Sequence, residues 1–242
     1  RVAQEMARIK HETGKLLHLD IEPEPDGLIE NTREVKAFYS NWLLPEGVRY
    51  LTGTLKISSS QAEEMLRTHI QICYDVCHFA VAYEEPQRVF EELQKEGIKV
   101  GKIQISAALK AALPENIKAR ALVAEKLNPF AESTYLHQVV EKDRNGNLTQ
   151  YTDLSIALKQ INKPEAREWR THFHVPIFLN DYQMLQSTQE DIVNVLKLLK
   201  QHFFTTNLEI ETYTWDVLPS DMKLGIQASI RREMEWVLHQ MN

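Results

Sequence analysis

Apolar and polar residues along this chain follow two different periods in alternating segments. Short segments at 16–22, 71–77 and 98–106 alternate every second residue, as half-buried strands do. The segments between them repeat their apolar residues every three or four positions, which predicts helices at 1–12, 31–43, 60–69 and 86–96. An alternation of strands with helices favours a parallel sheet.

The starts of three predicted helices carry a local signal. A residue suited to the N-cap is followed three positions later by Glu, as in a capping box. The three pairs are Asn31 with Glu34, Ser60 with Glu63, and Ser187 with Glu190.

The regular alternation of predicted strands and helices stops between 107 and 170. A helical patch is followed there by an extended run at 135–141, an Asn145-Gly146 turn of the kind that joins hairpin strands, and a short helix at 153–160. We therefore expect 107–170 to be an insertion on the rim of the sheet.

Regular alternation resumes after the insertion. The pattern predicts an extended segment at 170–178, a helix at 188–203, a strand at 208–215 and a final helix at 220–240. In that final helix, helical spacing predicts a buried stripe of Leu224, Ile230, Met234 and Leu238.

Four strand-helix units can be counted, half the number in a (β/α)8 barrel, and a complete barrel typically takes about 250 residues. Because the chain spends more than 60 of its 242 residues on the insertion and starts at Arg1 within a helix, we expect the carboxyl-terminal half of a TIM barrel. The fold class is then α/β, with 1–242 as a single domain. A doubly wound open sheet is the alternative, although its usual glycine fingerprint is absent.

Composition narrows the function classes. The chain is 43% hydrophobic and 26% charged, as globular proteins are, and its net charge of -6 disfavours nucleic acid as a partner. The two cysteines, Cys73 and Cys77, do not make a disulfide framework, and we expect them to pack inside the barrel of a protein in the reducing cytoplasm. Because of the negative net charge a small-molecule substrate is the expected partner, and neither a signal peptide nor an 18-residue apolar span is present.

Polar residues recur near the carboxyl ends of the predicted strands, out of phase with the aliphatic ones. In a barrel, aliphatic residues of that phase face the helices and the others face the axis, so the polar set should meet at one mouth, where barrel active sites lie. The set comprises Glu22, Asp75 with His78, Gln104, His172 with His174, and Glu211.

Carboxylate, amide and imidazole groups together suit a divalent metal such as Mn, Mg, Zn or Co. The expected metal ligands are Glu22, Asp75, Gln104, Glu211 and His172. The two glutamates, Glu22 and Glu211, are also the expected catalytic groups, because carboxylates facing each other can move a proton on either side of a substrate. The expected substrate contacts are His78, His174, Arg170, His137 and Trp215. A purely structural role is the alternative for each inward carboxylate, as one half of an ion pair.

The strand-end residues also resemble a known superfamily, the xylose-isomerase-like barrels, which include sugar isomerases and epimerases and abasic-site endonucleases. Members carry a Glu after the fifth strand, Asp-x-x-His after the sixth, His after the seventh and Glu after the eighth. Glu22, Asp75 with His78, and Glu211 match this order, and Gln104 departs from the usual His. The resemblance implies a TIM barrel whose first four strands are not in this sequence.

Longer strings are similar to the metabolite traffic protein EboE family over nearly the whole chain. They include Leu-Asp-Ile-Glu-Pro-Glu-Pro, Cys-Tyr-Asp-Val-Cys-His-Phe-Ala, Tyr-Leu-His-Gln-Val-Val, His-Phe-His-Val-Pro and Glu-Thr-Tyr-Thr-Trp-Asp-Val-Leu-Pro. This resemblance implies a bacterial protein linked to the movement or processing of secondary-metabolite precursors, with protein partners in a trafficking complex.

Three functions therefore compete. The first is a metal-dependent isomerase or epimerase acting on a small sugar, polyol or precursor metabolite. The second is a non-catalytic metabolite-binding or scaffold protein, which Gln104 and the long insertion favour. The third is a phosphodiester-cleaving endonuclease, against which the acidic balance argues.

Overall fold

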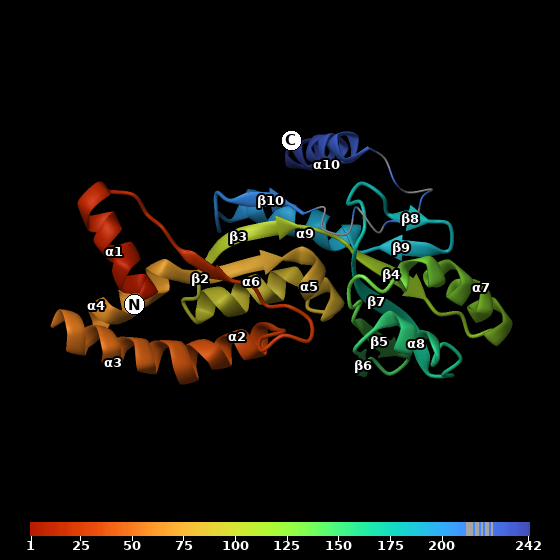
Figure 1. Ribbon diagram of the computed structural model, residues 1–242, viewed down its shortest axis with the longest axis horizontal. Helices are drawn as coiled ribbons and strands as arrows, with labels where there is room; N and C mark the ends of the chain where they lie inside the picture. Colours follow the sequence, from red (N-terminus) through yellow and green to blue (C-terminus); the bar gives the residue numbers. More distant parts are fainter. Residues whose placement is uncertain (212–214, 216–217, 219, 221–222, 224) are drawn as a thin grey trace.

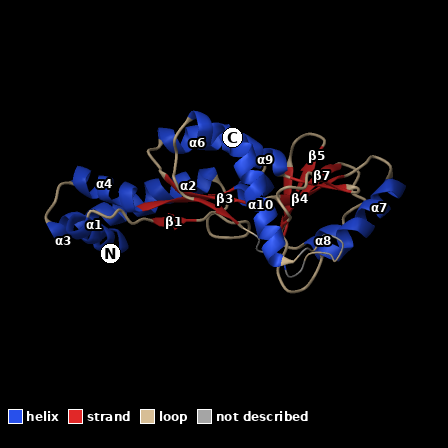
Figure 2. Ribbon diagram, turned by 90° about the horizontal axis from the view of Figure 1, so that it is seen from above, coloured by secondary structure: helices blue, strands red, loops and turns tan. Residues whose placement is uncertain are grey.

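The computed structural model describes the chain except for residues 212–214, 216–217, 219, 221–222 and 224. The described residues form a mixed α/β structure with one parallel and one antiparallel sheet, which lie end to end in Figure 1. Helices flank the parallel sheet, and the last helix lies over the junction between the two sheets in the view of Figure 2.

The parallel sheet has the strand order β1-β2-β3-β10 among the described residues. Its strands are β1 (Leu19–Ile21), β2 (Ile70–Asp75), β3 (Val100–Ile105) and β10 (Leu208–Ile210). Because the register pairs Asp75 with Gln104 and Ile210 with Ile105, the polar strand ends lie at one edge. The predicted strands exist but are shorter than expected, and 212–214 of the predicted strand at 208–215 lie outside the described residues.

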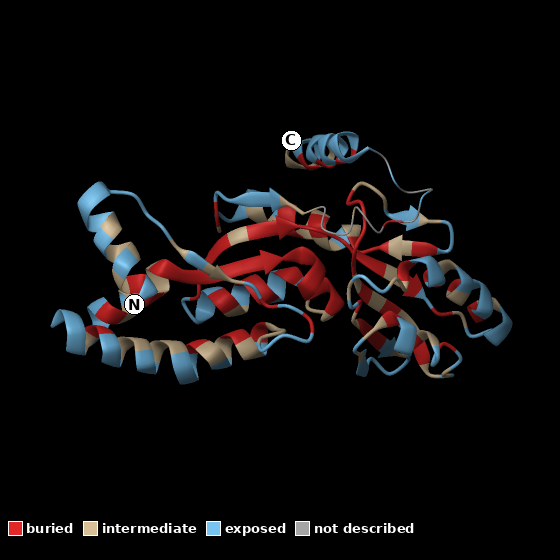
Figure 3. Ribbon diagram, in the orientation of Figure 1, coloured by how far each residue is buried: buried red, intermediate tan, exposed pale blue. Residues whose placement is uncertain are grey.

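The aliphatic face of this sheet is buried as its phase predicts. Ile72, Tyr74, Ile103 and Ile105 are almost fully buried in the main core, and the central strands in Figure 3 are coloured as buried nearly throughout. The helices that flank the sheet or pack around it are α2 (Thr32–Phe38), α3 (Leu44–Leu55), α4 (Ser59–His69), α6 (Pro86–Lys95) and α9 (Gln189–Gln201).

Helix starts and lengths differ in part from the prediction. Asn31 caps α2 and accepts from the Glu34 amide, as expected, but α4 starts from a capping box of Ser58 and Gln61, so the predicted cap at Ser60 is wrong. The helix predicted at 31–43 continues through a π-helical turn (Tyr39–Leu43) into α3. Helix α1 (Val2–Thr13) packs against α4.

The antiparallel sheet begins at Ala108, directly after β3. Its order is β6-β5-β7-β4-β9-β8, with β4 (Ala108–Ala112), β5 (Val139–Asp143), β6 (Leu148–Tyr151), β7 (Ala166–His174), β8 (Asp181–Tyr182) and β9 (Leu185–Ser187). Helices α7 (Ile117–Leu127) and α8 (Leu154–Leu158) and a 3-10 turn (Asn128–Phe130) belong to the same part of the chain. The Asn145-Gly146 hairpin is confirmed, since β5 and β6 pair around it.

Strand β7 corrects the prediction for 170–178. We expected this segment to resume the parallel alternation, but β7 pairs antiparallel with both β4 and β5. The antiparallel sheet therefore continues past 170 to Ser187. Period-two patterning identifies a strand without revealing its partner, because pairing is decided by distant segments.

The final helix, α10 (Ile226–Met241), is shorter than the predicted 220–240 and buries a different face. Its buried residues are Ser229, Glu233 and Val237, whereas Ile230, Met234 and Leu238 are exposed, so the predicted stripe is wrong; Leu224 lies outside the described residues. No helix among the described residues is long and apolar enough to cross a membrane.

Candidate metal and substrate site

Three strand-end carboxylates meet around the side-chain amide of Gln104. Its Nε2 lies 3.0 Å from Glu22 Oε1, 2.9 Å from Asp75 Oδ2 and 2.5 Å from Glu211 Oε2. The three carboxylates thus come from the ends of β1, β2 and β10, while Gln104 lies on the strand between β2 and β10. The structure thus brings these four side chains together.

The orientation of the Gln104 amide is set by its other end. The Cys73 thiol donates to Gln104 Oε1 over 2.9 Å, which leaves Nε2 as the atom that faces the carboxylates. An amide N–H donates hydrogen bonds and has no lone pair for a cation. In this orientation Gln104 holds the carboxylates together as a hydrogen-bond donor.

Asp75 is the most enclosed member of the cluster, with a fully buried side chain. Its Oδ1 accepts from the His78 backbone N–H, which caps helix α5 (Val76–Val81), and from the Ser106 hydroxyl at 2.7 Å. Its Oδ2 turns to Gln104. The side chain therefore starts a helix and supplies one oxygen to the cluster.

The carboxyl groups differ in protonation. Burial and the hydrogen bond and charge of Asp75 raise the pKa of Glu211 to about 8, and burial raises the pKa of Glu22. Burial opposes ionisation of Asp75 as well, but the facing imidazoles of His78 and His174 outweigh it and hold the pKa of Asp75 well below its usual range. Two carboxyls with a raised pKa beside one with a lowered pKa are the consequence of burying like charges together.

Imidazoles lie next to the acidic cluster. The ring centroids of His78 and His172 are 4.6 Å apart, and those of His172 and His174 are 5.5 Å apart. His78 approaches Glu22 Oε1 to 3.6 Å, and His174 approaches Glu211 Oε2 to 3.9 Å. Strand β7 delivers the pair at 172 and 174 from the antiparallel sheet, so the site lies where the two sheets join.

The imidazoles of His78 and His174 are buried and that of His172 is half-buried, and hydrogen bonds orient His78 and His172. His78 Nδ1 lies 2.9 Å from the Pro23 carbonyl oxygen, and His172 Nδ1 lies 2.9 Å from Gln138 Oε1. Because both oxygens only accept, Nδ1 carries the proton in each ring and Nε2 retains its lone pair. Burial lowers the pKa of His174 to about 4 and that of His172 well below its usual range.

The other predicted substrate contacts lie farther from the carboxylates. Arg170 donates to Glu168 Oε1 and to the Ala80 carbonyl and stacks on the Tyr83 ring. His137 lies between Glu132 Oε1 and the His172 carbonyl oxygen. Both side chains therefore form hydrogen bonds with other groups of the protein.

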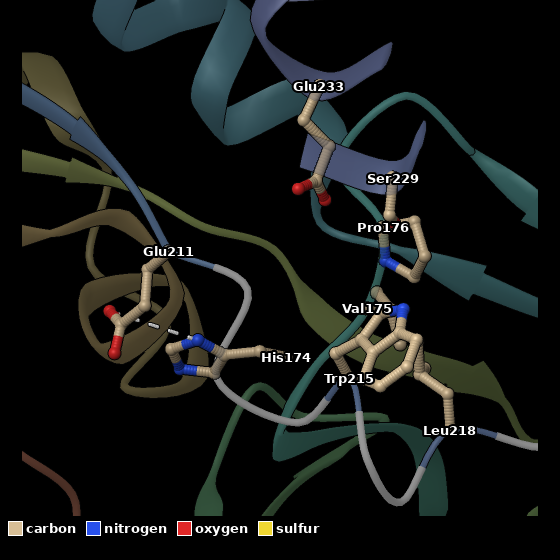
Figure 4. Close-up of a pocket in the computed structure, with 8 residues that line it drawn as sticks. All are labelled: His174, Val175, Pro176, Glu211, Trp215, Leu218, Ser229 and Glu233. Carbon is tan, nitrogen blue, oxygen red and sulfur yellow. Dashed lines mark ion pairs between the residues drawn. The ribbon is translucent and has the colours of Figure 1, made fainter. Parts of the chain in front are cut away.

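Trp215 is near the cluster. It lines a cavity of about 10 Å³, room for about one water molecule, together with His174, Glu211 and Glu233. Figure 4 shows Glu211 and His174 to the left of Trp215, and Glu233, from α10, above it.

Several site residues were missed from the sequence. Ser106 holds Asp75, Gln138 orients His172, and Glu233 is almost fully buried with an Oε2 that has no hydrogen-bond partner among the described residues. Ser106 could have been found, because it lies in the same strand phase as Gln104. Gln138 and Glu233 gave no signal, since each reaches its neighbour through tertiary packing.

Groups of three ligand atoms within 4.8 Å of one another show where the described residues could hold a metal ion. They are Glu22, Asp75 and Glu211; Asp75, His78 and His174; Glu24, His78 and His172; and Cys77, His172 and His174. The predicted ligand His172 therefore groups with other imidazoles and with Glu24 or Cys77, and not with Glu22, Asp75 and Glu211.

Comparisons with protein-family models, with curated proteins and with solved structures found no match.

Proposed function

We propose that the protein is a divalent-metal-dependent isomerase or epimerase acting on a small sugar, polyol or secondary-metabolite precursor. The observation that carries the proposal is the meeting of Glu22, Asp75 and Glu211 at the carboxyl edge of neighbouring parallel strands. This edge is where open and closed α/β sheets bind ligands.

The residues fit a divalent ion. Three carboxylates placed around one point repel one another, and two of them have a raised pKa, as expected for a cation site whose charge is not balanced by protein groups. Glu22, Asp75 and Glu211 would hold the metal, which would polarise a substrate carbonyl or hydroxyl oxygen. Oxygen ligands suit Mn, Mg, Co or Zn.

Exposure divides the roles of the carboxylates. The Asp75 side chain is fully buried, whereas those of Glu22 and Glu211 are 36% and 27% exposed. Only the two glutamates of this set can reach a substrate, so they are the groups that move its proton, and Asp75 fixes their geometry. His78 and His174 lie 3.6 Å from Glu22 and 3.9 Å from Glu211, and they would hold the two glutamates in position.

The curvature of the parallel sheet supports a barrel. A Cβ added at Gly101 on β3 would lie 2.0 Å from Asp20 Oδ1 on β1, although β2 separates these strands. Side chains from alternate strands that share a layer are typical of a TIM-barrel interior. We propose on this ground that the sheet is half of a (β/α)8 barrel, of the xylose-isomerase-like type and the EboE family, with the antiparallel sheet on its rim.

Two buried free thiols, Cys73 and Cys77, support a cytoplasmic location, because a reducing compartment keeps thiols unpaired. Protein partners in a metabolite-trafficking complex belong to the same proposal.

Metal analysis and proton exchange test the function together. The protein is supplied in turn with Mn, Mg, Co and Zn, and the bound metal is quantified in wild type and in Glu211→Gln. Each loaded form is then incubated with a panel of small sugars and polyols in deuterium oxide, with incorporation next to the carbonyl carbon as the readout. We expect deuterium in the wild-type reaction and none with Glu211→Gln. Absence of bound metal under every supply condition would refute the proposal.

A scaffold function is the second candidate, favoured by the Gln104 amide, which fills the centre of the carboxylates with a hydrogen-bond donor. Metabolite binding that survives the combined Glu22→Gln and Asp75→Asn substitutions would favour the scaffold.

A further inference from the structure

The Cys77 thiol lies beside the imidazoles of His172 and His174. We propose that Cys77, His172 and His174 form a second metal site, which takes zinc. The Cys77 Sγ and one ring nitrogen of each histidine lie within 4.8 Å of one another. This inference does not rest on the proposed isomerase function.

The local structure explains how the three side chains meet. Cys77 lies in the first turn of α5, whose start is fixed by the Asp75 cap, and the Cys77 backbone N–H donates to Ser106 Oγ at 2.9 Å. His172 and His174 are two residues apart on β7, so they project from the same face of the strand. Helix α5 packs against β7, which brings the thiol to the imidazoles.

A hydrogen bond holds His172 in the tautomer that can bind a metal ion. His172 donates its Nδ1 proton to Gln138 Oε1, which leaves the Nε2 lone pair for a ligand bond, and an outer hydrogen bond of this kind is typical of metal-binding histidines.

The donor set selects the metal. One sulfur and two imidazole nitrogens suit zinc, whose sites with three protein ligands leave a fourth position open. The neighbouring carboxylates offer oxygen alone, which suits harder ions. Zinc binding here replaces the Cys77 S–H bond with a Zn–S bond and releases the thiol proton to solvent.

Simple packing is the competing explanation for Cys77. Its side chain is fully buried and belongs to a small apolar cluster with Val81, Ala108 and Val140. A buried thiol of that kind needs no metal. The two explanations differ in whether the sulfur can bond to an added ion.

Cobalt substitution distinguishes them. The purified, metal-stripped protein is loaded with Co²⁺, and a thiolate-to-cobalt charge-transfer band is sought in the near ultraviolet. We expect the band in wild type, its loss in Cys77→Ser and its retention in Cys73→Ser, the matched control, whose thiol contacts Gln104. Zinc bound per chain should fall by one in Cys77→Ser. Absence of the band in wild type, or its persistence in Cys77→Ser, would overturn the proposal.

Two further variants complete the design. His172→Gln keeps the thiol and should weaken zinc binding by at least about 10-fold, which covers the case that Cys77→Ser does not fold; unchanged zinc affinity would count against the site. Glu211→Gln should retain the charge-transfer band. The two proposals can fail separately. If the charge-transfer band is present but the carboxylates bind no metal, the second site is supported and the proposed isomerase function is refuted.

Discussion

The Cys73 thiol donates to the side-chain oxygen of Gln104 over 2.9 Å, and this contact turns the Gln104 amide nitrogen to the three carboxylates. The pair therefore decides whether the centre of the site offers a hydrogen-bond donor or a lone pair. In the orientation that Cys73 sets, Gln104 offers the donor.

Replacing Gln104 with His should strengthen metal binding. An imidazole nitrogen can supply the lone pair that the amide nitrogen lacks, and one added ligand bond worth about 1.4 kcal/mol would tighten binding about 10-fold. Isothermal titration with Mn²⁺ and Zn²⁺ would measure it. Gln104→Leu, similar in size and without polar atoms, is the control and should not gain affinity.

Removal of the Asp75 side chain should destabilise the fold. Asp75→Ala deletes the cap of α5, leaves the Ser106 hydroxyl without its acceptor and removes one of the three acceptors of the Gln104 amide, at a cost of about 3 kcal/mol in the free energy of unfolding. Urea denaturation of the metal-free protein would show the loss. Asp75→Asn keeps a capping oxygen and should cost less; equal losses would contradict the capping role.

A methyl group at Gly101 should disturb the inner layer of the parallel sheet. In Gly101→Ala the new Cβ would lie 2.0 Å from Asp20 Oδ1 and 2.7 Å from His18 Nδ1, so the hydrogen-bonded pair of His18 and Asp20 must move. We expect a loss of about 1–3 kcal/mol from overpacking. Gly53→Ala, where an added Cβ meets no atom within 4 Å, is the matched control. Equal stability of the two variants would show that β1 does not curve over β3.

Glu233 should make stability depend on pH. Burial raises its pKa from 4.5 to about 7, so the folded state holds a proton that the unfolded state has released between these values. Its contribution is therefore present below about pH 4.5 and is lost as the pH rises through 7, by about 3 kcal/mol. Glu211 titrates in the same direction, so wild type is compared with Glu233→Gln.

Urea denaturation of both proteins at about pH 5 and pH 8 would isolate the Glu233 contribution. Glu233→Gln should gain stability relative to wild type as the pH rises, because its amide cannot ionise. The Ile177 amide, which donates to Glu233 Oε1 at 3.3 Å, keeps an acceptor in the variant. A pH-independent difference between the proteins would contradict the raised pKa.

The exposed edge of the parallel sheet should promote association. Strand β1 lies at the edge of the sheet, and its Leu19 is 47% exposed. Leu19→Lys places a charge on this edge and should reduce self-association. Sedimentation velocity at several protein concentrations would measure the effect. Lys56→Ala, a charge change remote from β1, serves as control, and equal association of Leu19→Lys and wild type would exclude the edge as the contact.

Local patterning predicted most elements because it reflects local physics. Period-two alternation placed β2 and β3, the Asn145-Gly146 turn placed the hairpin of β5 and β6, and strand phase brought Asp75 and Gln104 to one edge. The predictions from sequence were wrong where contacts with distant segments decide the structure. Strand β7 was assigned to the wrong sheet, and α10 buries Glu233 where helical spacing predicted Ile230 and Met234.

By itself, the sequence determined the identity of the strand-end residues and their common face, since both follow from side-chain alternation along each strand. Only the tertiary structure decided which donors meet. It set the Gln104 amide through Cys73, and it carried His172 and His174 on an antiparallel strand to Cys77. Distances between atoms on different elements depend on how the elements pack, and local periodicity does not encode that packing.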